Sequence, residues 1–246
     1  MNNDPHIEIA VIIPTLNEVG NIARLLDGIL AADARLCAVV VDDGSTDETD
    51  KRVLERAAVE KGRGCERVHL IERGKKMGYA SAIQDGMRFA LGRGARLILQ
   101  MDADFSHDPK YLPSLLAMSE SCDLVIGSRY VAGGGTQNWG IDRKILSGGA
   151  NALARTLLKL PVRDCTAGFR CWRRELIEQA GVLDVRVQGY AFLFVTLDKV
   201  RACGARVGEV PIIFVDRQFG QSKMSRTVIL EAVRVLFRLW LKRLRK

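Results

Sequence analysis

The first half of the chain alternates short, unbroken apolar runs with longer segments in which apolar residues recur every three or four positions. Unbroken apolar runs are typical of strands buried on both faces, whereas the longer repeat is typical of helices that cover a sheet. The alternation therefore predicts an α/β fold, with a mostly parallel sheet and helices on both faces. In such a fold, functional side chains are expected at the carboxyl ends of the strands.

Five strands and three helices are expected in this half. The predicted strands are residues 8–13, 38–41, 67–71, 96–101 and 124–126. The predicted helices are residues 21–32, 46–60 and 79–91. The first of these helices has an apolar face, as expected for a helix that packs against a sheet, formed by Ile22, Leu25, Leu26, Ile29 and Leu30.

The second half has a different pattern. Residues 131–141 contain Gly133, Gly134 and Gly135 in succession and are predicted to form a loop. Helices are predicted at 143–158 and 173–179, a strand at 207–215, and a polar loop at 217–223. The sequence shows no repeat and no low-complexity linker, so residues 1–224 are interpreted as one domain, followed by a helix at 225–246.

The composition fits one folded domain with a sizeable core, because the chain has 246 residues and 48% of them are hydrophobic. The six cysteines show no Cys-x-x-Cys spacing, and the sequence opens without a secretory leader. We therefore expect reduced thiols in a cytosolic compartment. No apolar stretch approaches the roughly 20 residues that a membrane-spanning helix needs, so none is predicted.

The apolar run at 96–101 is followed by two carboxylates, Asp102 and Asp104, separated by one residue. Hard oxygen ligands suit Mg²⁺ or Mn²⁺, and the phosphates of a substrate can complete the coordination shell. The pair therefore indicates a metal-dependent enzyme that uses a nucleotide sugar. An acidic turn at the end of a surface strand is the alternative interpretation, because such a pair also arises by chance.

Two more predicted strands end in polar side chains. Residues 14–18 read Pro-Thr-Leu-Asn-Glu, and residues 42–47 read Asp-Asp-Gly-Ser-Thr-Asp. Their oxygens can accept hydrogen bonds from a nucleobase and from ribose hydroxyls. Turns and helix caps formed by Asn17 and by residues 45–47 are the alternative. Neither the Rossmann nor the P-loop glycine pattern is present, so a diphosphate must be neutralised by a metal and by basic side chains.

Basic residues follow the predicted strands of the second half. Arg129 comes soon after the strand at 124–126, and Arg217 and Lys223 lie in the polar loop. The guanidinium of Arg can donate two parallel hydrogen bonds to a phosphate, whereas the ammonium of Lys contacts it as a point charge. Solvated loop residues are the alternative interpretation. Cations near two carboxylates favour a site that holds two phosphorylated groups, a donor and an acceptor.

The segment after Met224 has a helical period and seven basic residues against one acidic residue, which gives +6 of the total net charge of +8. One side of this helix includes Val233, Leu236 and Trp240, and the other side is mainly basic. Such a helix suits the interface of a membrane with anionic headgroups, and a helix packed on the core is the alternative. No nucleic-acid-binding module accompanies the charge, so no nucleic-acid partner is expected.

Taken together, these motifs resemble family-2 glycosyltransferases of the GT-A fold, a Rossmann-like α/β fold, and more narrowly the dolichyl-phosphate or polyprenyl-phosphate mannose synthases. The resemblance covers nearly the whole chain. It rests on Pro-Thr-Leu-Asn-Glu at 14–18, Asp-Asp-Gly-Ser-x-Asp at 42–47, Asp-Ala-Asp-Phe-Ser-His-Asp-Pro at 102–109, Gly-Ser-Arg-Tyr at 127–130, Trp139-Gly140 followed by Arg143-Lys144, Gly-Phe-Arg at 168–170 and Phe-Gly-Gln-Ser-Lys at 219–223.

The resemblance implies that residues 1–224 form a catalytic domain. Its implied activity is the inverting transfer of mannose from GDP-mannose to a polyprenyl or dolichyl phosphate, with Mg²⁺ or Mn²⁺ bound by Asp102 and Asp104. Asp104, Arg129 and Arg143 are the implied catalytic residues. The implied nucleotide site is lined by Pro14, Leu16, Glu18, Asp43 and Asp102, and the implied phosphate ligands are Arg129, Arg143, Arg217 and Lys223.

The resemblance also implies a peripheral protein at the cytoplasmic face of a membrane, recruited by its own surface or by a membrane-protein partner.

Two alternatives to the implied activity remain open. The resembling proteins have Gly-Tyr-x-Phe-Gln-x-Glu where this chain has Leu193 and Val195 in place of Gln and Glu. This apolar pair leaves open a donor such as UDP-glucose or another UDP-sugar, and also a catalytically lapsed domain that binds a membrane surface.

Overall fold

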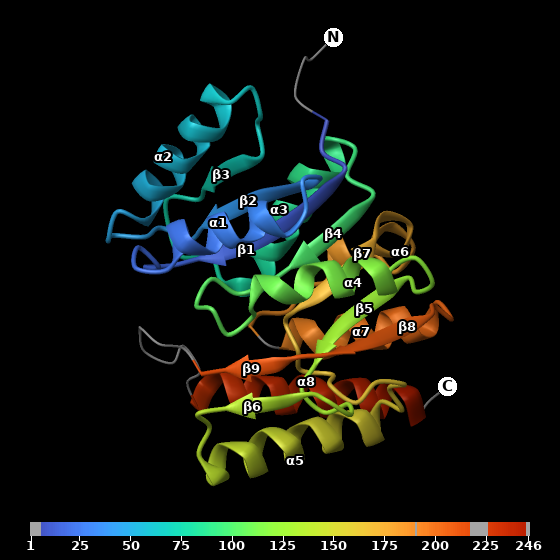
Figure 1. Cartoon of the computed structure of the whole chain (residues 1–246). Helices are drawn as coiled ribbons and strands as arrows, with labels where there is room; N and C mark the ends of the chain where they lie inside the picture. Colours follow the sequence, from blue (N-terminus) through green and yellow to red (C-terminus); the bar gives the residue numbers. More distant parts are fainter. Residues whose placement is uncertain (1–5, 190, 217–225, 245–246) are drawn as a thin grey trace.

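The computed structural model describes residues 6–189, 191–216 and 226–244. A seven-stranded sheet in the order β3-β2-β1-β4-β7-β5-β8 forms its centre (Figure 1). All of these strands are parallel to one another except β7, which is antiparallel to β4 and β5. The strands of this sheet are β1 (Ile9–Thr15), β2 (Leu36–Asp42), β3 (Val68–Glu72), β4 (Leu97–Gln100), β5 (Leu124–Ser128), β7 (Arg170–Arg173) and β8 (Val207–Pro211).

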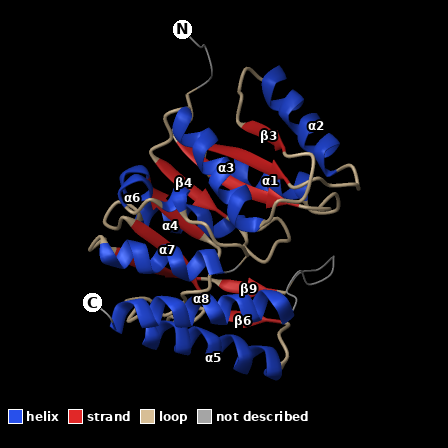
Figure 2. Cartoon of the chain, turned by 180° about the vertical axis from the view of Figure 1, so that it is seen from behind, coloured by secondary structure: helices blue, strands red, loops and turns tan. Residues whose placement is uncertain are grey.

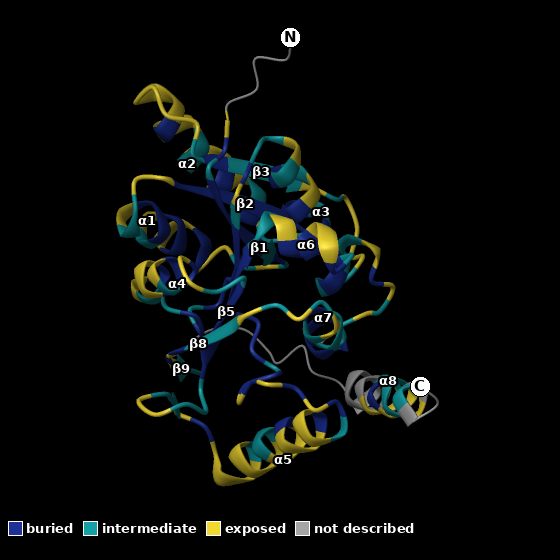
Figure 3. Ribbon diagram, turned by 90° about the vertical axis from the view of Figure 1, so that its right-hand side faces the viewer, coloured by how far each residue is buried: buried dark blue, intermediate teal, exposed yellow. Residues whose placement is uncertain are grey.

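Helices cover both faces of the sheet (Figures 2 and 3). One face carries α3, α6 and α7, and the other carries α1, α2 and α4. The prediction of a mostly parallel sheet with helices on both faces is therefore confirmed. The helices are α1 (Ile22–Ala32), α2 (Thr49–Gly62), α3 (Tyr79–Gly92), α4 (Leu112–Met118), α5 (Ile141–Leu157), α6 (Arg174–Gln179), α7 (Ala191–Ala202) and α8 (Arg226–Leu244).

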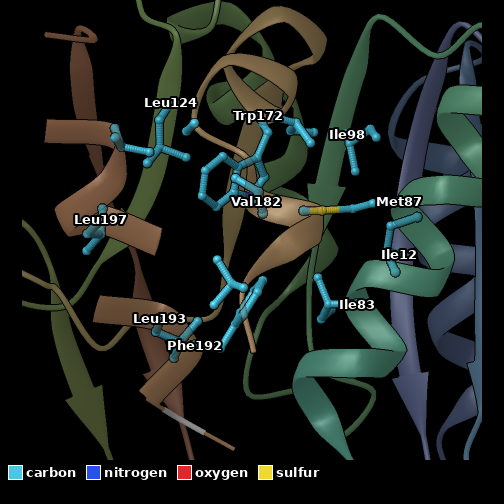
Figure 4. Close-up of a cluster of buried hydrophobic side chains, with 14 of the residues drawn as sticks. Ile12, Ile83, Met87, Ile98, Leu124, Trp172, Val182, Phe192, Leu193 and Leu197 are labelled. Carbon is cyan, nitrogen blue, oxygen red and sulfur yellow. The ribbon is translucent and has the colours of Figure 1, made fainter. Parts of the chain in front are cut away.

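Successive residues of each buried strand belong to different core layers. In β1, Ile12 contributes to the layer under α3 and α7, whereas Ile13 contributes to the layer under α1 and α4. Figure 4 shows the first layer, in which Trp172 of β7 lies among side chains of neighbouring strands and of α7. Both layers exclude water from the strands, which is why these segments read as unbroken apolar runs.

The second half of the chain differs from the prediction in three places, besides helix α7, which was not predicted. Arg173, expected at the start of a helix, ends strand β7, and the helix begins at Arg174. The loop expected at 131–141 contains a short strand, β6 (Gly135–Gln137), which pairs with β9 (Ile213–Val215). The strand expected at 207–215 is divided, because the chain leaves the large sheet after Pro211 and enters the small one at Ile213.

The helices α5 and α8 lie side by side at the end of the molecule where β6 and β9 form the small sheet (Figures 1 and 2). Leu236 of α8 is buried in the core layer that includes α7, whereas Val233, Phe237 and Leu241 are exposed. Helix α8 therefore both packs on the protein and presents an apolar surface. In the part of the chain that the structure describes, every helix is too short or too polar to cross a bilayer.

Candidate active site

The carboxyl ends of β1, β2 and β4 meet at one edge of the sheet, as expected for parallel neighbours. Thr15 at the end of β1 lies opposite Asp42 at the end of β2, and the backbone N–H of Met101 donates to the carbonyl of Ile12 at 3.1 Å. Asp102 and Asp104 follow directly. The two carboxylates therefore leave the sheet beside β1, close to the segment at 14–18.

A cavity of about 250 Å³ opens beside these carboxylates. Its polar lining combines Asp102 and Asp104 with two guanidinium groups, those of Arg129 and Arg143. The rest of its wall is largely apolar and comes mainly from α5, α7, α8 and the small sheet. The apolar lining includes Leu146, Ala150, Leu153, Phe194, Ile212, Phe214, Val233 and Leu236.

The loop that carries the two carboxylates is held in one shape by its own side chains. The Asp104 carboxylate accepts hydrogen bonds from the backbone N–H of Ser106 at 3.1 Å and from its hydroxyl at 2.6 Å. The backbone N–H of Asp102 donates to Nδ1 of His107 at 3.0 Å. Asp102 is about a third exposed in its side chain and Asp104 is buried, and both face the cavity.

His107 is a buried part of this loop that the sequence analysis did not single out. Its ring stacks on Phe169 with the centroids 5.0 Å apart and meets the edge of Phe214 at 5.6 Å. Because Nδ1 accepts a hydrogen bond, the neutral ring carries its proton on Nε2. Burial lowers the pKa of His107 to about 4, which the negative charge of Asp104 only partly opposes.

This depressed pKa predicts that the protein loses stability in mild acid. Between pH 6.5 and about 4 the unfolded chain binds a proton at His107 that the folded chain does not bind. The free energy of unfolding should then fall by up to about 1.4 kcal/mol per pH unit across this interval. Urea unfolding at a series of pH values measures the slope, and His107→Gln should reduce it. An unchanged slope in that variant would contradict this assignment.

Arg129 lies at the end of β5 in a buried ion pair. Its Nε and Nη2 atoms each donate to a different oxygen of Asp164 at 2.7 Å, and Nη2 also donates to the hydroxyl of Thr166 at 2.8 Å. Burial disfavours the charge of both partners, but their mutual hydrogen bonds outweigh it. The pKa of Asp164 is therefore lowered and that of Arg129 is raised. Among the described residues the remaining nitrogen, Nη1, makes no hydrogen bond, so it is available to donate to a ligand in the cavity.

Arg143 is the more exposed of the two guanidinium groups. It forms an ion pair with Asp216, and its guanidinium carbon lies 4.3 Å from the centre of the Trp139 ring. The indole Nε1 of Trp139 is buried and, within the residues described, has no hydrogen-bond partner. The two arginines and Trp139 therefore form one wall of the cavity, with N–H groups suited to an anionic ligand.

A third arginine, Arg170, holds the loop at 165–168, which forms part of the cavity wall. It is fully buried and donates to the carbonyls of Ala167, Cys165 and Leu193 and to the hydroxyl of Thr196. Burial lowers the pKa of Arg170 to about 10, so it remains charged at neutral pH. The loop at 165–168, of which Thr166, Ala167 and Gly168 line the cavity, is thus tied to α7 by a buried cation.

Gly168 packs closely against side chains that surround the cavity. A Cβ atom at Gly168 would lie 3.0 Å from the hydroxyl of Tyr79, 3.4 Å from the His107 ring and 3.8 Å from a carboxylate oxygen of Asp102. A side chain here would therefore press on the Tyr79 hydroxyl and lie in ordinary contact with the loop that carries the carboxylates.

Asp102 lines the cavity, whereas the other residues predicted for the nucleotide site lie at the same sheet edge but outside the cavity lining. The Asp43 carboxylate accepts the backbone N–H groups of Met77 and Gly78, both at 2.8 Å, and pairs with Arg73 at 3.0 Å. The Glu18 carboxylate accepts from Asn21 at 3.0 Å. Pro14 and Leu16 are half-buried at the end of β1. These contacts shape the edge, and Arg217 and Lys223 lie outside the described residues.

The turns that were the alternative interpretation of these strand ends are present. The side-chain oxygen of Asn17 accepts the backbone N–H of Thr46 at 2.8 Å, and the Ser45 hydroxyl accepts that of Asn17 at 2.9 Å. The segments at 14–18 and 42–47 are thus joined by hydrogen bonds. These bonds fix the conformation of the sheet edge beside the carboxylates.

Comparison with known proteins identifies the family. The family model described as Glycosyl transferase family 2 matches residues 10–181. The chain belongs to this glycosyltransferase family. It is 40% identical to a polyprenol monophosphomannose synthase of Mycolicibacterium smegmatis over 224 residues, which cover 91% of this chain and 83% of the relative. It is 37% identical to an undecaprenyl-phosphate mannosyltransferase of Micrococcus luteus over 227 residues, which cover 92% and 91%.

Solved structures support the GT-A fold of this glycosyltransferase. A glucosyl-3-phosphoglycerate synthase from Mycobacterium tuberculosis, in complex with Mn²⁺, UDP and glucosyl-3-phosphoglycerate, superposes with a TM-score of 0.64 and 19% identity. The match covers 94% of this chain and 78% of that one. The same synthase with Mn²⁺ and UDP-glucose also gives a TM-score of 0.64, with 18% identity and coverage of 94% and 77%. The expected fold is therefore confirmed.

The site of this glycosyltransferase fits a divalent cation that is shared with a substrate. No group of three His, Cys, Asp or Glu side chains in the described ranges is arranged to hold a metal alone. Asp102 and Asp104 offer carboxylate oxygens beside an open cavity. Mg²⁺ and ions like it are commonly bound by one or two carboxylates together with substrate phosphates. This donor set suits an ion that arrives with a diphosphate.

Leu193 and Val195, which stand where the resembling proteins have Gln and Glu, lie in α7. Leu193 is buried in the core layer under α3, and Val195 is half-buried. Phe194, between them, faces the cavity instead. The two positions therefore contribute packing in this enzyme, where an amide and a carboxylate would require polar partners.

Proposed function

We propose that this glycosyltransferase transfers mannose from GDP-mannose to a polyprenyl phosphate such as dolichyl phosphate, with inversion at the anomeric carbon. The observation that carries the proposal is that the cavity is lined by charged side chains on one part of its wall and by apolar side chains on the rest. The same cavity holds two carboxylates, the Arg129 and Arg143 guanidiniums, and an apolar wall from three helices. A phosphate attached to a hydrocarbon chain matches the cations and the apolar wall together. The names of the two relatives support mannose as the sugar and a polyprenyl phosphate as the acceptor.

The chemistry requires positioning rather than a dedicated base. A phosphate monoester is already anionic at neutral pH, so its oxygen can attack the anomeric carbon directly. The new carbon–oxygen bond forms as the bond to the diphosphate breaks, and the diphosphate leaves with the electron pair. Arg129 and Arg143 hold the acceptor phosphate in line with the breaking bond, which is an effect of proximity and charge stabilisation.

We propose Mg²⁺ or Mn²⁺ as the cofactor, held by Asp102 and Asp104. A bound divalent ion would supply charge neutralisation to the departing diphosphate. Asp102 also contributes to the proposed nucleotide site with Pro14, Leu16, Glu18 and Asp43, while Arg217 and Lys223 are proposed to hold phosphates. Pro14, Leu16, Glu18 and Asp43 lie where β1 and β2 end, at the same sheet edge as Asp102. This position supports their assignment to the nucleotide site.

The donor is tested by competition between nucleotide sugars. Purified protein, a short polyprenyl phosphate and either Mg²⁺ or Mn²⁺ are incubated with GDP-mannose or with UDP-glucose. Glycolipid formation from GDP-mannose is expected to exceed that from UDP-glucose by at least about tenfold, because a mismatched base or sugar leaves buried polar groups unpaired. The opposite preference would make this a UDP-sugar enzyme. No product from any donor, despite binding to vesicles, would instead favour a catalytically lapsed surface-binding protein.

We propose a peripheral location at the cytoplasmic face of a membrane, because the proposed acceptor is a lipid phosphate. The six cysteines are free thiols in the structure, which suits a reducing compartment. A membrane-protein partner is an alternative means of recruitment. The exposed apolar residues of α8 support direct contact with lipid.

A further inference from the structure

Trp139 is a buried residue of the cavity wall whose indole group is not explained by packing alone. The residue is 9% exposed, and its Nε1 has no hydrogen-bond partner among the residues described. A buried donor without an acceptor destabilises a folded protein. A phenylalanine or a leucine at this position would avoid that cost, so the indole ring is expected to have a further role.

The indole ring lies against both guanidinium groups that line the cavity. The guanidinium carbon of Arg143 is 4.3 Å from the centre of the Trp139 ring, and that of Arg129 is 5.5 Å from it. Both distances are within the range over which the face of an aromatic ring attracts a cation, and tryptophan gives the strongest attraction of this kind. Trp139 therefore links an arginine that follows β5 to an arginine of α5.

The two guanidinium groups repel each other, and nearby groups offset this repulsion. Asp164 pairs with Arg129, and Asp216 pairs with Arg143. Neither carboxylate is part of the cavity lining, so each holds its arginine from outside the cavity. The ring of Trp139 adds an attraction that acts on both cations. Both guanidinium groups can therefore face the same anionic ligand.

The small sheet of β6 and β9 places the ring between these groups. Trp139 lies two residues after β6, which pairs with β9. The ring of Phe214 on β9 meets the Trp139 ring edge-on, with the centroids 5.4 Å apart. Directly after β9, the backbone N–H of Asp216 donates to the carbonyl of Gln137 at 3.1 Å. Figure 1 shows β6 and β9 beside α5, which carries Arg143. The ring and the carboxylate that hold this arginine thus come from one hydrogen-bonded unit.

We propose that Trp139 is a positioning residue, which holds the guanidinium groups of Arg129 and Arg143 together as one binding site for a phosphate monoester. This inference rests on the proposed function, in which the two arginines hold the acceptor phosphate. Without the ring, Arg143 would depend on its ion pair with Asp216, whose two side chains are 41% and 29% exposed. Exposed ion pairs hold a long side chain weakly. The guanidinium of Arg143 would then leave its place beside Arg129 for part of the time.

Binding of geranyl phosphate, a phosphate monoester of a short isoprenoid alcohol, tests this proposal by titration calorimetry without a donor sugar. The wild type is compared with Trp139→Phe, which keeps a ring but lacks the N–H group, and with Trp139→Leu, which lacks the ring. We expect the dissociation constant to rise about threefold in the first variant and at least about tenfold in the second, because the attraction between ring and cation weakens and then disappears.

Two further measurements separate positioning from a purely structural role. In turnover, the KM for the acceptor should rise by the same factors, while the KM for the donor stays within about twofold of the wild type. In urea unfolding, Trp139→Phe should be about as stable as the wild type, because the loss of packing is offset by removal of the unpaired donor.

The matched control is Phe89→Leu, which also removes a ring that contacts an arginine. The ring of Phe89 on α3 lies 3.7 Å from the guanidinium carbon of Arg93, and neither residue is part of the cavity lining. This variant should bind geranyl phosphate within about twofold of the wild type.

Three outcomes would overturn the role of Trp139. The first is wild-type affinity in Trp139→Leu, and the second is an equal loss of affinity in the Phe89→Leu control. The third is a loss in Trp139→Phe as large as that in Trp139→Leu, which would assign the effect to a direct contact of the indole N–H with the ligand. A lack of glycolipid product, with these affinities changed as expected, would count against the proposed function alone. A wild type that does not bind geranyl phosphate would overturn both.

Discussion

Replacing Asp104 by Asn is expected to lower the rate of mannosyl transfer about 100-fold or more while leaving the fold intact. The substitution removes a negative charge from the proposed metal site, and removal of one preorganised charge-stabilising group typically costs about 10²–10³ in rate. The amide oxygen of Asn can still accept the hydrogen bonds that Ser106 donates to Asp104. The loss should therefore appear in turnover and in Mn²⁺ affinity rather than in the melting temperature.

The matched control for this variant is Asp108→Asn. Asp108 lies on the same loop, accepts the backbone N–H of Lys110 at 3.0 Å and is not part of the cavity lining. Its replacement should leave transfer within about twofold of the wild type, as expected for a side chain remote from the reacting atoms. Transfer by Asp104→Asn at more than half the wild-type rate, with Mg²⁺ and with Mn²⁺, would refute the role assigned to this carboxylate.

Replacing Asp164 by Ala is expected to destabilise the protein by about 3–5 kcal/mol, because it leaves the buried guanidinium of Arg129 without its partner. The side chains of Arg129 and Asp164 are 8% and 0% exposed, so the guanidinium would remain largely buried without its counter-charge. Urea unfolding measures the change. The matched control is Glu178→Ala, which breaks the exposed pair between Arg174 and Glu178 and should cost at most about 1 kcal/mol.

A double-mutant cycle distinguishes this explanation from a simple loss of packing. The cycle compares Arg129→Met, Asp164→Leu and the double variant. The double variant removes both charges and should recover much of the stability that Asp164→Leu loses, since a buried pair is often replaceable by apolar groups. The same double variant should bind the acceptor poorly, because it lacks the guanidinium that faces the cavity. Additive losses of stability would show that the two charges are not coupled.

Much of the first half of the fold could be predicted from the sequence, because its strands are buried on both faces and leave a clear apolar signal. The strand β7 gives no such signal, since Arg170–Arg173 has only four residues and two of them are charged. Helix α7 was missed for the opposite reason: seven of its twelve residues are buried, so no polar face marks its period.

The candidate site shows the same division. Asp102, Asp104, Arg129 and Arg143 stand out in the sequence, and the structure brings them to one cavity. Asp164 and His107 were missed as partners because their roles arise only from folding. Asp164 lies 35 positions from Arg129, and no periodic pattern predicts that pairing. His107 is five positions from Asp102, within the quoted motif, which is the signal that could have identified it.

The antiparallel strand β7 sets the width of the reaction centre. It separates β4, which leads to the carboxylates, from β5, which leads to Arg129. With neighbouring strands about 4.8 Å apart, one intervening strand places these two ends roughly 10 Å from each other. The carboxylates that follow β4 and the guanidinium that follows β5 are thus separate groups of one cavity, and Arg129 pairs with Asp164 instead of with Asp102 or Asp104.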